Sequence, residues 1–115
     1  MRQSDNVGEL LQRPQFRRDE ILSKQINRAS VSVPNNISEG FLRKNDTEFF
    51  NFLRIATASN GEVRSSILIA LGRNYLTREE ATPLLDQNDM IGRMIRRLQS
   101  TLKPQSRTSR HSGSR

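Results

Sequence analysis

The sequence predicts an all-α protein, an up-down antiparallel helical bundle with three long helices. Apolar residues recur every three or four positions in three segments, which is the spacing of a helix face that packs on a core. Polar turns with helix-capping sequences separate these segments, and no stretch alternates as a strand would. The chain has 115 residues, of which 33% are hydrophobic. That is the length of a single domain, and helices with such thin apolar faces often complete their burial by self-association.

The first long helix is predicted over residues 19–42. Its apolar positions keep within an arc of about 120°, the width of a core-facing stripe, even where the chain passes Pro34. They are Leu22, Ile26, Ala29, Val33, Ile37 and Phe41. Because proline lacks the backbone donor and crowds the preceding turn, a kink is expected near residues 28–33. Residues 1–18 are polar and interrupted by Pro14, so they are predicted to form a polar segment or a short helix stub.

The second long helix is predicted from a cap at Asn45 or Asp46 to about residue 74. Its apolar residues again recur at threes and fours. Asn60 and Gly61 interrupt this stripe at its centre, where an apolar pair is expected. The sequence therefore predicts a local weakness there, of about 1 kcal/mol for the glycine alone relative to alanine.

The third long helix is predicted to begin at Thr77, whose capping box is closed by Glu80, and to continue to Leu102. Its apolar residues follow a heptad pattern in which Asn88 occupies an a position. A buried polar residue at such a position often sets helix register or the number of partners.

Three segments follow from these patterns. Residues 1–18 form the polar N-terminal segment, residues 19–102 the helical bundle domain, and residues 103–115 a basic tail that is expected to be disordered. The chain has no cysteine, no apolar run of about 18 residues that could span a membrane and no apolar leader segment. We therefore expect a cytoplasmic protein without a membrane partner.

The residues that usually carry catalysis are scarce. The single histidine, His111, falls in the basic tail, and the neighbouring carboxylates occur at helix starts, where the helix dipole accounts for them. No phosphate-binding loop, dinucleotide fingerprint or nucleophile elbow is present. The sequence thus predicts a protein that is not an enzyme and that has no cofactor, metal or small-molecule substrate.

Basic residues are the main functional signal. The net charge is +7, and 16 of the 19 basic residues are arginine, whose planar fork binds phosphate bidentately. Three arginines of the last helix fall on heptad positions away from its apolar seam, where Asp89 could offset the charge of Arg93 four residues later. The predicted nucleic-acid-binding residues are Arg43, Lys44, Arg93, Arg96, Arg97, Lys103, Arg107 and Arg110. An ordinary solvated helix face with a basic tail would show the same pattern.

A second, smaller signal lies on the first long helix. Glu39 and Arg28 belong to a polar stripe beside the apolar one, and Val31 lies opposite the apolar stripe. We expect Arg28, Val31 and Glu39 to contact a partner or a neighbouring subunit. The alternative is that the polar stripe forms hydrogen bonds within the bundle, which would support the backbone around Pro34.

Two long motifs resemble a known family. Residues 25–40 read QINRASVSVPNNISEG, and residues 48–56 read EFFNFLRIA, followed by Ser59. These motifs resemble the four-helix bundle proteins associated with intervening sequences in large-subunit ribosomal RNA genes. Relatives of that family include the accessory variability proteins of diversity-generating retroelements. The resemblance covers residues 19–102 and implies an up-down four-helix bundle, with ring-like homo-oligomers in some relatives.

The family has a long first helix ahead of the first motif, whereas this chain has only about eighteen residues there. The first helix is therefore expected to be truncated or missing, which leaves effectively three long helices. Two functions follow as hypotheses. One is a non-catalytic oligomer that binds nucleic acid, RNA rather than DNA, through its arginine-rich faces. The alternative is an oligomeric adaptor that docks a protein partner such as a reverse transcriptase.

Overall fold

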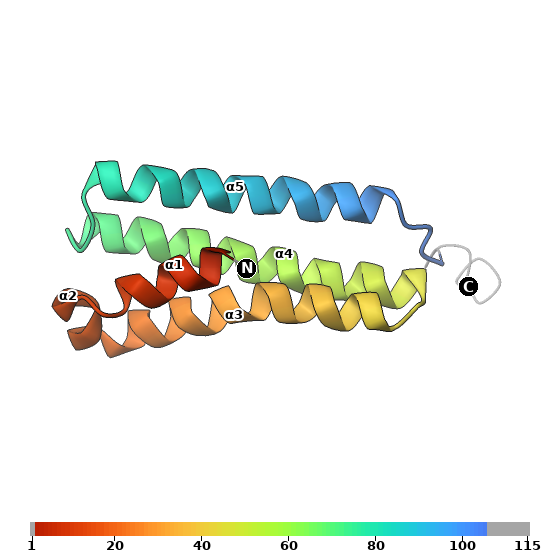
Figure 1. Cartoon of the computed structure of the whole chain (residues 1–115), viewed down its shortest axis with the longest axis horizontal. Coiled ribbons are helices and arrows are strands. Elements are labelled where there is room, and N and C mark those ends of the chain that lie inside the picture. Colours follow the sequence, from red (N-terminus) through yellow and green to blue (C-terminus); the bar gives the residue numbers. More distant parts are fainter. Residues whose placement is uncertain (1, 106–115) are drawn as a thin grey trace, which may run out of the picture.

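The structure, a computed structural model, describes residues 2–105, which form helices and no strand. This confirms the predicted all-α bundle. The three long helices run up, down and up, with α4 packed against both α3 and α5 (Figure 1). The helices are α1 (Arg2–Leu10), α2 (Pro14–Arg18), α3 (Glu20–Leu42), α4 (Asp46–Gly72) and α5 (Arg78–Ser100).

The N-terminal segment is short but is part of the fold. α1 packs against α3 and α5, and α2 packs against the start of α3. Val7 and Leu10 of α1 are buried, and Phe16 of α2 is fully buried. With nine residues, α1 is about 14 Å long, against about 35 Å for the 23 residues of α3. α1 therefore lies along only one half of the bundle (Figure 1).

The core divides into two clusters along the bundle. The larger cluster takes residues from every helix and includes Val7, Phe16 and Ile67. The smaller one consists of buried residues from the three long helices alone. Its members are Val33, Leu53, Ala56, Ile91 and Ile95. The half of the bundle without α1 thus closes its core with three helices.

Asn60, which interrupts the apolar stripe of α4, lies between these clusters and has hydrogen-bond partners there. It is buried with Gln3 of α1 and Asn88 of α5. Gln3 Nε2 donates to Asn60 Oδ1 at 3.1 Å, and Asn60 Nδ2 donates to the Asn88 carbonyl at 3.0 Å. Asn88 Nδ2 lies 2.9 Å from Gln3 Oε1 and 3.0 Å from the Asn60 carbonyl. We call these three residues the amide layer. Because its members come from three helices, the layer fixes their relative register.

α3 runs through Pro34 without a break. Polar side chains next to the proline bond to one another and to the backbone. Asn36 Nδ2 donates to the Ser32 carbonyl at 2.8 Å, and the hydroxyls of Ser32 and Ser59 are 2.8 Å apart. These contacts favour the hydrogen-bonding alternative for this part of the polar stripe.

Gly40 allows α3 and α4 to approach closely at the other end of the bundle. A Cβ atom at this position would lie 2.7 Å from Phe49 Cδ1 and 2.8 Å from Phe52 Cβ. Contacts that short do not occur in folded proteins, so the glycine is needed for the packing of these two helices.

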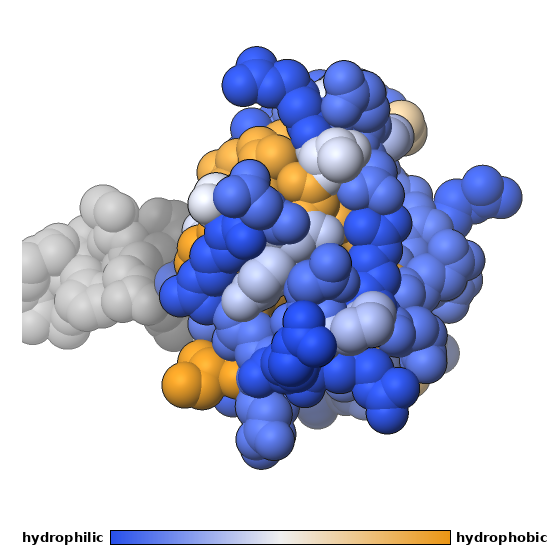
Figure 2. All heavy atoms as spheres, turned by 90° about the vertical axis from the view of Figure 1, so that its left-hand side faces the viewer, coloured by the Kyte–Doolittle hydropathy of each residue, from blue (hydrophilic) through white to orange (hydrophobic). Residues whose placement is uncertain are grey.

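The end of the bundle formed by α2 and the turn between α4 and α5 is covered mostly by hydrophilic side chains (Figure 2). An ion pair there joins Arg13 to Glu80, with 2.6 Å between the guanidinium and the carboxylate. Two hydrogen bonds lower the pKa of Glu80 from its ordinary value to about 2. The bond from the Arg13 side chain has the larger effect, and the bond from the Thr77 backbone N–H has the smaller one. The capping box of α5 and the chain before α2 therefore share one carboxylate.

This carboxylate predicts a pH dependence of stability. Because the pKa of Glu80 is lower in the folded chain than in the unfolded one, its contribution is fully present above about pH 5 and is lost as the pH falls towards 2. Glu80→Gln should therefore be less stable than the parent chain at pH 6, and the difference should shrink at pH 3. Urea denaturation of both proteins at the two pH values measures this. A difference that does not change with pH would contradict it.

Candidate nucleic-acid interface

A hollow of about 260 Å³ lies between α4 and α5, next to the amide layer. Gly61 of α4 and Gly92 of α5 line it and contribute no side chain, which leaves space between the helices. Arg64, Arg93 and Arg96 also line it. We call this feature the arginine hollow. It combines a concave surface with three guanidinium groups, the side chains that best match phosphate geometry.

One carboxylate, that of Asp89, lies among the described residues of the hollow. The sequence suggested that Asp89 would offset Arg93, four residues later on the same helix. That interpretation was wrong, because Arg64 reaches Asp89 from the neighbouring helix at 2.8 Å. Within residues 2–105, Arg93 and Arg96 have no ion pair or hydrogen bond. The Arg64–Asp89 pair is about half exposed, so it is weak and its arginine can exchange partners.

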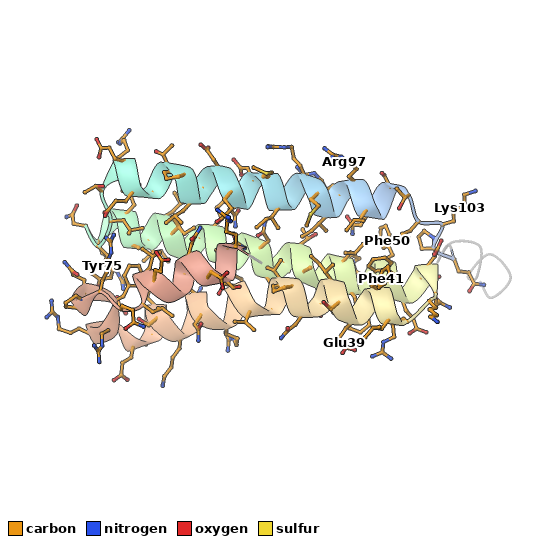
Figure 3. The ribbon with its side chains drawn as sticks, in the orientation of Figure 1. Glu39, Phe41, Phe50, Tyr75, Arg97 and Lys103 are labelled. Carbon is orange, nitrogen blue, oxygen red and sulfur yellow. The ribbon has the colours of Figure 1, made fainter. Side chains whose placement is uncertain are left out.

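Arg97 lies in the last turn of α5, close to Arg93 and Arg96 in the chain. Figure 3 shows it on the side of α5 that faces away from the rest of the bundle. The three α5 arginines thus extend from the hollow to the outer surface of the helix. Arg93 and Arg97 are one turn apart, about 6 Å along the axis.

The remaining described candidates gather at the end of the bundle where α3 meets α4 (Figures 1 and 3). Lys44 is exposed in the turn between these helices. Lys103 lies beside the start of α4, because its backbone N–H donates to Asp46 Oδ2 at 2.9 Å. Arg107 and Arg110 lie outside the described residues.

Arg43, at the same end, is less free than the sequence suggested. Its guanidinium lies 3.2 Å from Glu39 and 5.1 Å from the centre of the Phe52 ring. Both contacts are within the chain, so Glu39 and Arg43 satisfy each other on the surface of α3. Arg43 can still add positive charge to this end, where Lys44 and Lys103 are exposed.

Two further arginines belong to the same surface, and the sequence analysis missed both. Arg64 is described above, and the exposed Arg54 lies on α4 in the same stripe as Gly61 and Arg64. The hydrogen bonds of Asn60 with Asn88 near the middle of the two helices and of Asp46 with Lys103 at one end show the antiparallel pairing of α4 and α5. This pairing brings Arg54 to the level of Arg96. The spacing of Arg54, Gly61 and Arg64 by seven and then three residues, which places them near one side of a helix, was the signal that could have found them.

The other predicted contact residues lie on α3. Arg28 and Val31 are exposed and line an open hollow of about 380 Å³ on this helix. Val31 is 42% exposed, which is high for an apolar side chain in a helix interior. α4 also exposes apolar side chains, with Ile55 at 49% and Leu68 at 46%. These positions do not share one face: Leu68 lies four residues after Arg64 on the same side of α4, whereas Ile55 points to another side of that helix.

The family model of the 23S rRNA-intervening sequence proteins matches residues 1–97. The chain belongs to this family. The matched range takes in all of α1 to α4 and the arginine hollow. The link to proteins of diversity-generating retroelements stays a prediction.

A crystal structure shares the fold. It is that of a protein of unknown function from the S23 ribosomal protein family of Bacteroides thetaiotaomicron. The two chains superpose with a TM-score of 0.75 at 24% identity, over 84% of this chain and 87% of the other. No curated protein matches the chain.

The part of the chain that the structure describes lacks two other kinds of feature. No three histidine, aspartate or glutamate side chains gather there as a metal site would require. Among the same residues, no helix is long and apolar enough to cross a membrane. The arginine hollow is therefore the feature with the clearest binding chemistry.

Proposed function

We propose that this family member is a non-catalytic protein that binds RNA through the phosphate backbone. One observation carries the proposal: Arg64, Arg93 and Arg96 share a hollow that contains a single carboxylate. Guanidinium groups form short, charge-assisted hydrogen bonds to phosphate oxygens, often two at a time. The name of the family refers to 23S rRNA, which favours RNA over DNA as the partner.

Backbone contacts fit this surface better than base stacking. The only tyrosine, Tyr75, donates its hydroxyl to Asp19 at 2.8 Å, and its ring packs 5.5 Å from that of Phe16. No aromatic side chain lines the hollow within the described residues. Base recognition by stacking requires exposed aromatic rings, and the exposed Phe41 lies at the end of α3, away from the hollow. We therefore expect little sequence preference from the hollow itself.

A salt titration tests the proposal. We expect the wild-type chain to bind a 20-nucleotide single-stranded RNA in fluorescence anisotropy, and its affinity to fall about twentyfold between 50 and 200 mM salt if three phosphates are contacted. The affinity for a single-stranded DNA of the same sequence shows whether the chain distinguishes ribose from deoxyribose. Absence of binding at 50 mM salt, or an affinity that does not respond to salt, would contradict the proposal.

Self-association is a second proposal, because a different observation favours it. Val31, Ile55 and Leu68 are exposed on the outer surfaces of α3 and α4, and apolar positions of this kind are typical of contacts between subunits. Light scattering after size exclusion should give a multiple of the 13.2 kDa chain mass. A strict monomer at about 100 μM, a concentration at which weak micromolar contacts form, would exclude it. The same exposed apolar positions would serve the alternative function as an adaptor for another protein.

A further inference from the structure

Gly61 and Gly92 have no packing role that explains them. Both lie inside long helices, where glycine is less favourable than alanine, and neither has a positive φ. A Cβ at Gly61 would meet nothing within 4 Å. A Cβ at Gly92 would lie 3.5 Å from the guanidinium of Arg96 and 3.6 Å from Asn60 Nδ2, which is ordinary contact. A Cβ at Gly40, by contrast, would clash with two phenylalanines.

What the two glycines share is the arginine hollow, which both line. Side chains at these positions would take up part of the space in the hollow, and the one at position 92 would lie beside the guanidinium of Arg96. We propose that this hollow seats one phosphate group of a single RNA strand between α4 and α5. The inference rests on the proposed function and adds to it the place and the kind of strand.

The dimensions and charges of the hollow support a single strand. A space of about 260 Å³ admits one phosphate group, and the flexible backbone of a single strand can turn that group into the hollow. Neighbouring phosphates would then meet Arg54 on α4 and Arg97 on α5, which lie beyond the hollow in the same direction. Arg64 would turn from Asp89 to the phosphate, since their pair is exposed and weak.

A double substitution, Gly61→Ala with Gly92→Ala, tests the seat. Because alanine fits both positions and favours the helix, the melting temperature should rise by about 5 °C. The affinity for the 20-nucleotide single-stranded RNA should nevertheless fall at least fivefold at 100 mM salt. Gly8→Ala is the matched control, since its Cβ also meets nothing within 4 Å and Gly8 does not line the hollow. It should leave RNA affinity unchanged.

The outcomes separate the two proposals. If the wild-type chain does not bind the RNA, the proposed function fails. If it binds with the expected salt dependence but the double variant binds equally well, only the seat is wrong. If the double variant melts at a lower temperature than the wild-type chain, Gly61→Ala alone is used to test the seat. A titration with inorganic phosphate distinguishes a free anion from a strand. If 10 mM phosphate raised the melting temperature as much as the RNA does, and the double variant lost this effect, the assignment to RNA would be overturned.

Discussion

Replacing Asn88 with alanine should lower the free energy of unfolding by about 3 kcal/mol. The side chain is only 3% exposed, and its amide donates to Gln3 Oε1 and lies 3.1 Å from Asn60 Oδ1. Without it, buried acceptors on α1 and α4 lose a donor, and each such group costs about 1–3 kcal/mol when no water replaces it. A small cavity adds to the loss.

Urea denaturation followed by circular dichroism measures the change. Asn35→Ala is the control, because Asn35 is an exposed asparagine inside α3 and its replacement should change stability by less than about 0.5 kcal/mol. A double-mutant cycle with Gln3→Ala should show coupling of at least about 1 kcal/mol between the two amides. A loss of less than about 1 kcal/mol for Asn88→Ala would mean that the amide layer does not act as a unit.

The triple substitution of Arg93, Arg96 and Arg97 by alanine should weaken binding of single-stranded RNA about thirtyfold at 50 mM salt. Arg93 and Arg96 share one phosphate and Arg97 meets a neighbouring one, so two phosphate contacts are lost. Each removes about 0.7 from the slope of log affinity against log salt, so the slope should become shallower by about 1.4. All three side chains are exposed, which predicts little change in the melting temperature.

A charge-matched variant gives the control for this experiment. Arg17, Arg18 and Arg78 are exposed at the opposite end of the bundle, and their replacement by alanine removes the same charge. We expect the RNA affinity of this variant to fall only a few-fold, because its positive electrostatic field is weaker. The slope of log affinity against log salt should change less than in the first triple variant. Equal losses in the two triple variants would show that net charge alone attracts the RNA.

The long helices could be predicted because local signals determine them. The Asn45 side chain accepts from the Glu48 backbone N–H at 3.0 Å, and both bonds of the Thr77 capping box are present. These caps connect residues three positions apart, and the apolar stripes repeat within a turn or two. Caps and periodicity of this range are visible in a sequence without knowledge of its partners.

The amide layer and the hollow could not be predicted in the same way. Asn60 seemed to interrupt an apolar stripe, because its partner Gln3 is 57 residues away in a segment that looked merely polar. Asp89 was assigned to Arg93 on its own helix, whereas Arg64 lies 25 residues earlier. In both cases a contact between helices decides the chemistry, of α1 with α4 in the first and of α4 with α5 in the second.

The limited length of α1 means that the molecule should open in two stages. The cluster that contains Leu53 and Ile95 holds together through three helices and has no residue from α1. α1 can therefore detach while that half of the bundle stays folded, and its amide protons should exchange with solvent at a lower free energy than global unfolding requires. Each such opening would expose Asn60 and Asn88 to water, so the centre of the bundle becomes hydrated before either long hairpin separates.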